Sequence, residues 1–135
     1  MKKCPACGGG PLQREAREMT FEYKDQQLTY DQPGLWCGAC GEALLEPSDK
    51  EATDPFLFDF MAKIDGRLTT GDIRRIRKKL GLTQRQAGEV IGGGVNAFHR
   101  YETGKAYPAK GTENFLRLLD KHPYLLSELR PEAVA

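Results

Sequence analysis

The sequence predicts two domains: a small α+β domain built from a β-hairpin and a helix in residues 1–66, and an all-α domain of five helices in residues 67–135. Three observations predict this division. All four cysteines fall within residues 1–40, two short helical patterns flank a glycine break in residues 82–104, and the net charge changes from −5 in residues 1–66 to +6 in residues 67–135. Such charge asymmetry favours a nucleic-acid partner for the basic half.

The cysteines form two C-x2-C pairs, Cys4-Pro-Ala-Cys7 and Cys37-Gly-Ala-Cys40, and a glycine follows each pair. Glycine lets the backbone turn tightly, so that amide N–H groups can point at the sulfur atoms. Four thiolates suit tetrahedral zinc, and a shell of four cysteine ligands leaves no coordination position for water. We therefore predict one structural zinc ion per chain, bound by all four cysteines, in a domain too small to rely on its core alone.

Two other uses of these cysteines remain open from the sequence alone. Trp36–Cys40 locally resembles the active site of thioredoxin, and Cys4–Cys7 resembles that of glutaredoxin, but such motifs belong to a complete α/β fold. Only about 35 residues precede Trp36, and they have the pattern of a hairpin. An iron–sulfur site also needs four cysteines. Two C-x2-C pairs fit one metal ion better than two redox centres, and the reducing setting that we expect argues against disulfides.

Between the cysteine pairs, apolar and polar residues alternate in Met19–Tyr23 and again in Leu28–Tyr30, which predicts a β-hairpin connected by residues 24–27. The hairpin would bring the two cysteine pairs together at its base. A helix is expected over residues 55–65, because Pro55 suits the first helical position. An apolar stripe on this helix is expected to cover the hairpin; it consists of Phe56, Leu57, Phe60, Met61 and Ile64.

The second half begins with a basic helix over residues 72–80, and some of its cations, Arg75 and Lys78 among them, can reach DNA phosphates. Residues 82–104 then contain two short helices around a run of three glycines. Thr83 and Gln86 form a capping box for the first of them. Two short helices joined by a tight glycine turn predict a helix-turn-helix, whose second helix can enter the DNA major groove.

The second helix of this motif carries residues suited to reading bases. Asn96 and Arg100 are four residues apart and share one helix face; asparagine pairs with adenine and arginine with guanine. His99 is adjacent and is either a DNA contact or a bystander. Gln84 lies at the start of the preceding helix, where its amide suits a phosphate. The alternative for Asn96 is a local capping role.

Two further helices end the domain, one from Thr112 and one from Pro123 through Leu129, and residues 131–135 are expected to form a disordered tail. The last helices are richer in leucine than one buried side requires, so we expect a homodimer through the C-terminal domain. A dimer suits double-stranded operator DNA that is palindromic, with half-sites about one helical turn apart or a multiple of it.

The combination of these motifs resembles the MqsA antitoxin family, whose N-terminal domains are also described as YgiT-type zinc fingers. The resemblance rests on the four cysteines and on Arg77–Gln84, Gly92–Phe98, Arg100–Glu102 and Leu119–Pro123. It implies that the zinc-binding domain contacts a toxin of the MqsR type, an mRNA-cleaving ribonuclease. It also implies that the C-terminal domain dimerises on palindromic DNA upstream of its own operon and represses that operon.

We therefore expect an antitoxin and autorepressor without enzymatic activity, located in the cytoplasm of a bacterium and making no contact with a membrane. No apolar run approaches the length of a membrane span, and the sequence Met1–Cys4 lacks the apolar core of a signal peptide. Two alternatives stay open. One is a zinc-containing transcription factor without a toxin partner, and the other is a C-x2-C redox protein.

Overall fold

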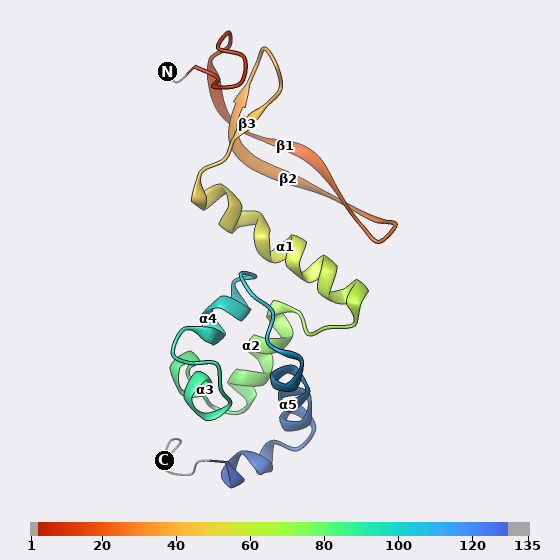
Figure 1. Ribbon diagram of the computed structural model, residues 1–135, viewed down its shortest axis with the longest axis vertical. Helices are drawn as coiled ribbons and strands as arrows, with labels where there is room; N and C mark the ends of the chain where they lie inside the picture. The colour runs from red at the N-terminus through yellow and green to blue at the C-terminus, as the bar shows by residue number, and fades with distance from the viewer. Residues whose placement is uncertain (1–2, 130–135) are drawn as a thin grey trace. The chain divides into compact units, whose positions relative to one another are not determined.

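The computed structural model describes residues 3–129, and the expected tail, residues 131–135, lies outside the described residues. The chain forms two compact units, Met1–Leu57 and Phe58–Ala135 (Figure 1). The division falls inside helix α1 (Pro47–Asp65), whereas the change of charge led us to expect it near residue 67. The reason is that the last part of α1 packs within the second unit.

A long antiparallel hairpin forms the frame of the first unit. β1 (Leu12–Tyr23) pairs with β2 (Gln26–Cys37) along its whole length, so that Leu12 lies opposite Cys37. The short β3 (Ala43–Leu44) pairs with β2, and Figure 1 shows the twisted sheet in the order β1-β2-β3. The predicted hairpin is confirmed. The strands are longer than the alternating segments from which we predicted them. In the first half of β1, charged residues obscure the alternation of apolar and polar positions, so the sequence pattern did not mark this part as a strand.

The hairpin turn contains two residues, Lys24 and Asp25, rather than the four that we predicted. Both have positive φ angles, 47° and 65°. Two successive residues with positive φ are typical of a type I′ turn, whose twist matches that of the strands on either side. The strand pairing therefore continues up to Tyr23 and Gln26.

The structure corrects the predicted start of α1, because the helix begins at Pro47 and contains Pro55 in its interior. The Asp49 carboxylate accepts a hydrogen bond from the Glu46 N–H at 2.9 Å. A proline in the first helical position and an acid in the first turn are both start signals, so the true start precedes the one that we chose. Pro55 removes one backbone N–H from the helix, but it does not end it.

The apolar stripe of α1 also differs from the prediction. Phe56 is 66% exposed, whereas Phe58 and Ala62 are buried. In the second unit the Phe58 ring stacks on Tyr107, with ring centroids 3.9 Å apart, and the Tyr107 hydroxyl donates to the Phe58 carbonyl at 3.2 Å. Contacts within the second unit therefore determine which residues are buried in the last part of this helix.

In the first unit, polar groups attach α1 to the hairpin. Arg14 of β1 donates to the buried Asp49 carboxylate at 2.8 Å. The Gln32 amide of β2 donates to the Asp49 carbonyl at 3.1 Å and accepts from the Thr53 hydroxyl at 3.1 Å. Because polar residues in such a pattern usually face solvent, the sequence did not single out these buried contacts.

The second unit contains the end of α1 and a cluster of short helices. These are α2 (Thr70–Lys79), α3 (Gln84–Val90), α4 (Ala97–Glu102), α5 (Lys110–Lys121) and the 3-10 helix η1 (Pro123–Glu128). Their core is formed by Leu68, Ile73, Ile76, Leu82, Ala87, Ala97, Phe98, Tyr101 and Leu116. Five α-helices are not confirmed, since the last predicted helix is a 3-10 helix. Among the described residues, no helix is long and apolar enough to span a bilayer.

Candidate metal centre and nucleic-acid interface

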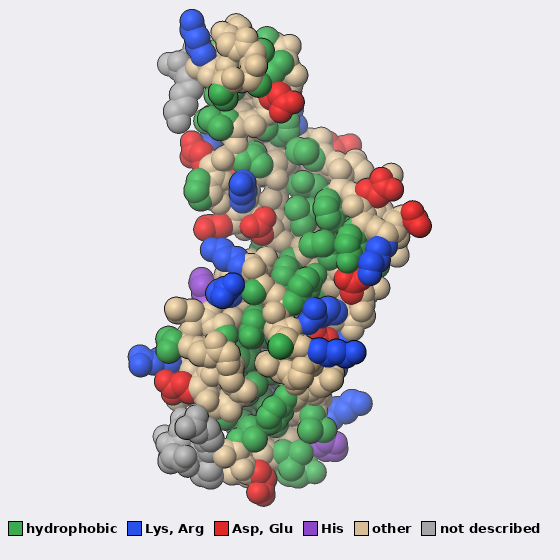
Figure 2. All heavy atoms as spheres, viewed as in Figure 1, with side chains coloured by type: hydrophobic (Ala, Val, Ile, Leu, Met, Phe, Trp, Pro, Cys, Tyr) green, Lys and Arg blue, Asp and Glu red, His purple; other side chains and the backbone are tan. Residues whose placement is uncertain are grey.

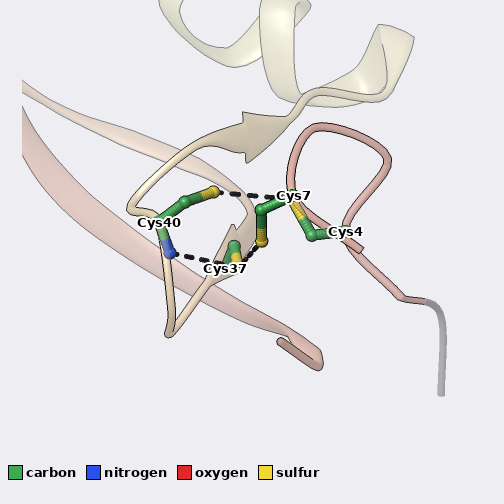
Figure 3. A group of neighbouring side chains, drawn as sticks. All are labelled: Cys4, Cys7, Cys37 and Cys40. Carbon is green, nitrogen blue, oxygen red and sulfur yellow. Dashed lines mark hydrogen bonds between the residues drawn. The ribbon is translucent and has the colours of Figure 1, made fainter. Parts of the chain in front are cut away.

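The two cysteine pairs meet at the base of the hairpin, where all four Sγ atoms lie within 4.8 Å of one another (Figure 3). The Sγ atoms of Cys4 and Cys40 are 3.6 Å apart, and those of Cys7 and Cys37 are 3.7 Å apart. Four sulfurs at about 2.3 Å from a tetrahedral zinc ion would be separated by about 3.8 Å. A disulfide needs about 2.05 Å. The spacing therefore fits a metal shell.

Each cysteine pair lies on a tight backbone turn that ends at a glycine. In the first turn, the Gly8 N–H donates to the Cys4 carbonyl at 2.8 Å. In the second, the Gly41 N–H donates to the Cys37 carbonyl at 3.1 Å. Both glycines have positive φ, 69° and 78°, a conformation that glycine adopts without a steric cost. The prediction that glycine permits these turns is therefore confirmed.

Backbone N–H groups point at the sulfur atoms and favour their ionised form. Hydrogen bonds from the Cys40 and Ala39 N–H groups lower the pKa of Cys37 to about 6. At Cys40 a backbone hydrogen bond at Glu42 lowers the pKa, but burial and the neighbouring thiols together raise it to about 12. Four adjacent thiols resist full ionisation unless a cation neutralises them, so this donor set fits zinc.

The close sulfur contacts join one pair to the other, Cys4 to Cys40 and Cys7 to Cys37. A thioredoxin-like centre instead works by forming a disulfide within one C-x2-C pair. The observed arrangement favours one shared metal ion over two redox centres. All four cysteines meet at one place, and their role as metal ligands stays a prediction.

The segment that we predicted to be a helix-turn-helix consists of α3, the glycine turn Gly92–Gly94 and α4. The predicted capping box is present: the Thr83 hydroxyl accepts from the Gln86 N–H at 3.1 Å, and the Gln86 side chain accepts from the Thr83 N–H at 2.9 Å. The three glycines have φ angles of 121°, 101° and 94°. The turn also approaches α3 closely, because a Cβ atom on Gly88 would lie 2.0 Å from the Gly94 carbonyl oxygen.

Three of the predicted DNA-contacting residues lie exposed on or beside α4, namely Asn96, His99 and Arg100. Asn96 is the N-cap residue of α4, yet its side chain makes no capping hydrogen bond. The alternative capping role of this side chain therefore finds no support. Its neighbours Ala97 and Phe98 are buried, so α4 presents one face to the core and keeps the other accessible.

The remaining predicted DNA contacts have different surroundings. Lys78 is exposed on α2. Both terminal nitrogens of Arg75 donate to the Asp120 carboxylate at 3.0 Å, so this arginine is already paired within the domain. Gln84 is half-buried and hydrogen-bonds to Glu102. On the face shown in Figure 2, Lys and Arg side chains are interspersed with acidic ones.

Sequence reasoning missed Glu102 of α4, whose carboxylate is fully buried. Arg77 of α2 donates to both of its oxygens, at 2.7 and 2.9 Å, and Arg74 donates at 3.3 Å. Burial raises the pKa of Glu102, but the hydrogen bonds and charge of Arg77, together with hydrogen bonds from Gln84 and Arg74, outweigh burial and hold the pKa below its usual value. One feature of the sequence could have indicated its burial: Glu102 directly follows Tyr101, and Tyr101 is part of the core.

Comparison with known proteins adds independent information. The family model described as the antitoxin component of the bacterial toxin-antitoxin system, MqsA, matches residues 1–130. Antitoxin MqsA of Escherichia coli (strain K12) is 38% identical over 133 residues, which cover 95% of this chain and 99% of that protein. The solved N-terminal domain of E. coli MqsA matches 48% of this chain and 98% of its own, with a TM-score of 0.45 and 20% identity.

Proposed function

The chain belongs to the MqsA family, the antitoxin components of bacterial toxin-antitoxin systems, and from this premise we propose a protein with two binding ends. The N-terminal domain, residues 1–66, binds zinc and neutralises a ribonuclease toxin of the MqsR type. The C-terminal domain, residues 67–135, dimerises on palindromic operator DNA and represses its own operon. The observation that carries the proposal is the 38% identity to an antitoxin along nearly the whole chain.

Support for zinc comes from the donor set itself. Cys4, Cys7, Cys37 and Cys40 would hold the ion, and their sulfur spacings are those of a tetrahedral shell. Zinc would supply folding free energy and no reactive position, because four protein ligands complete its coordination. The protein's own contribution is the pair of glycine turns, which aim N–H groups at the sulfurs.

Support for toxin binding by the first domain comes from charge. Residues 1–66 carry a net charge of −5, so an mRNA-cleaving toxin with a basic surface would be attracted to them. The test is co-expression of this chain with the product of the neighbouring gene. We expect the two to co-purify, and we expect the neighbour to arrest growth when it is expressed alone. Failure to co-purify together with a harmless neighbour would overturn the toxin-binding proposal.

Support for operator binding comes from α4. Asn96 and Arg100 are exposed four residues apart, which is the spacing of one helix face. Lys78 on α2 is exposed and suits a phosphate. Leu118 of α5 and Tyr124 of η1 are exposed apolar side chains, which support a dimer through this region. We also propose that His99 and Gln84 contact DNA. Arg75 would have to break its hydrogen bonds to Asp120 before it could contact a phosphate.

A further inference from the structure

Val95 is an exposed apolar residue two positions before α4, the proposed reading helix. It lies between the glycine turn and Asn96, and 52% of its surface is accessible. Ala97 and Phe98, which follow Asn96, are buried in the core. The apolar side chains that follow Val95 are thus part of the core, whereas the Val95 side chain lies outside it.

The backbone on either side of Val95 is held in place. The Gly94 N–H donates to the Gly88 carbonyl at 3.3 Å, and the Ala97 N–H donates to the Gly94 carbonyl at 3.3 Å. A Cβ atom on Gly93 would lie 2.8 Å from the Ala97 Cβ, so the turn packs closely against α4. Valine is also stiff, because its branched Cβ restricts the first side-chain torsion. Val95 thus presents two methyl groups in a defined place.

We propose that Val95 is a specificity-determining residue, which recognises a thymine by contact with its 5-methyl group in the major groove. In the major groove, thymine is the base that presents a methyl group, so an apolar contact there distinguishes thymine from the other bases. Valine has no side-chain donor or acceptor, so it can distinguish bases only by apolar contact and shape. This inference rests on the proposed operator binding, in which Asn96 and Arg100 of the same surface read neighbouring bases.

The test uses the full-length protein and a duplex from the promoter region upstream of its own gene, shortened to the segment that the protein protects. Each thymine is replaced in turn by deoxyuridine, which removes only the 5-methyl group. Binding is measured by fluorescence anisotropy at one salt concentration. We expect one thymine in each half-site at which the replacement weakens binding roughly fourfold, the effect of about one buried methyl group.

Val95→Ala should weaken binding to the unmodified duplex and should abolish the sensitivity to that deoxyuridine, as expected for two groups in contact. Met19→Ala is the matched control, because Met19 is also an exposed apolar residue, at 39%, in the other unit. It should keep the sensitivity of the wild type. Since Val95 is exposed, the melting temperature of Val95→Ala should not change.

Two results overturn the inference. Either every deoxyuridine duplex binds the wild-type protein as tightly as the unmodified one, or Val95→Ala keeps the same sensitive thymine. The first result needs no variant and so decides the matter even if Val95→Ala fails to fold. The proposed operator binding fails separately, if the wild-type protein does not prefer the promoter duplex over a scrambled duplex of the same composition, and Val95 recognition then falls with it.

Discussion

The Glu102 carboxylate connects α4 to α2 in the interior of the second unit. Its side chain is fully buried, and Arg77 is only 12% exposed, so the charges compensate each other out of contact with water. Removing one partner of such a pair leaves the other charge buried without compensation. A surface pair such as Arg75–Asp120, with side chains 54% and 26% exposed, does not carry this penalty.

Glu102→Gln should therefore destabilise the second unit by about 3–5 kcal/mol, since it leaves the Arg77 guanidinium buried without a counter-charge. Asp120→Asn is the matched control in the same domain and should cost about 1 kcal/mol or less. The measurement is urea unfolding at neutral pH, followed by far-UV circular dichroism. Equal losses in the two variants would show that the burial of Glu102 has no special importance.

For base reading, Arg100→Ala or Asn96→Ala should cost roughly 1–3 kcal/mol of binding to the operator and leave binding to unrelated DNA nearly unchanged. Lys78→Ala should instead weaken binding to all duplexes alike and make the salt dependence less steep, because phosphate contacts carry no sequence information. Titrations of operator and scrambled duplexes at several salt concentrations separate these effects. An equal loss on both duplexes for Arg100→Ala would contradict its assigned role.

At the scale of elements, the arrangement of α3 and α4 depends on the close contact between α3 and the glycine turn. Gly88 is buried within α3, and a side chain there would collide with the Gly94 carbonyl. Because the clashing atom belongs to the backbone, the turn or the helix must shift to accommodate a methyl group. The turn itself requires three successive residues with positive φ, a conformation that glycine adopts at little cost.

Gly88→Ala should destabilise the second unit by about 2 kcal/mol or more, although alanine favours helices, because overpacking against the backbone outweighs propensity. Gly111→Ala is the matched control: it also replaces a glycine in a helix, and its Cβ would meet no atom within 4 Å. That variant should be neutral or slightly stabilising. Thermal unfolding of both variants tests this, and a stabilised Gly88→Ala would refute the packing of the turn.

At the scale of the whole molecule, the two units should respond differently to loss of metal. Trp36 is the single tryptophan in the sequence, and it precedes Cys37 in the first unit, where it is buried. The second unit has a core of aliphatic and aromatic residues and contains none of the four cysteines. Its fold should therefore not depend on zinc.

Removing zinc with a strong chelator should unfold the first unit and leave the second folded. Trp36 fluorescence should shift to the red, while most of the helical circular dichroism signal and the binding to operator DNA should persist. Atomic absorption should find one zinc per chain before chelation. If DNA binding disappears together with the zinc, the protein would instead act as a metal-dependent transcription factor, the first alternative interpretation of the sequence.

Short-range patterns predicted much of this protein. The cysteine spacing and the glycines beside it identified the four sulfurs that converge, because a metal site requires particular residue types at particular intervals. The capping box at Thr83 and the glycine run located α3 and the turn that follows it, since both act within one helical turn. Metal binding, and the roles of Asn96 and Arg100 on DNA, stay predictions until they are measured.

Only the tertiary structure decided which polar groups are buried and which residues of α1 face a core. Gln32, Thr53 and Glu102 are buried because partners distant in the sequence satisfy their hydrogen bonds, and no local pattern contains those partners. By local rules Pro55 indicates a helix start, yet it lies inside α1. The first part of this helix belongs to the first unit and its last part to the second. The sequence by itself determined the local turns, caps and metal-ligand spacing, whereas long-range contacts determined burial, because burial depends on segments that meet only after folding.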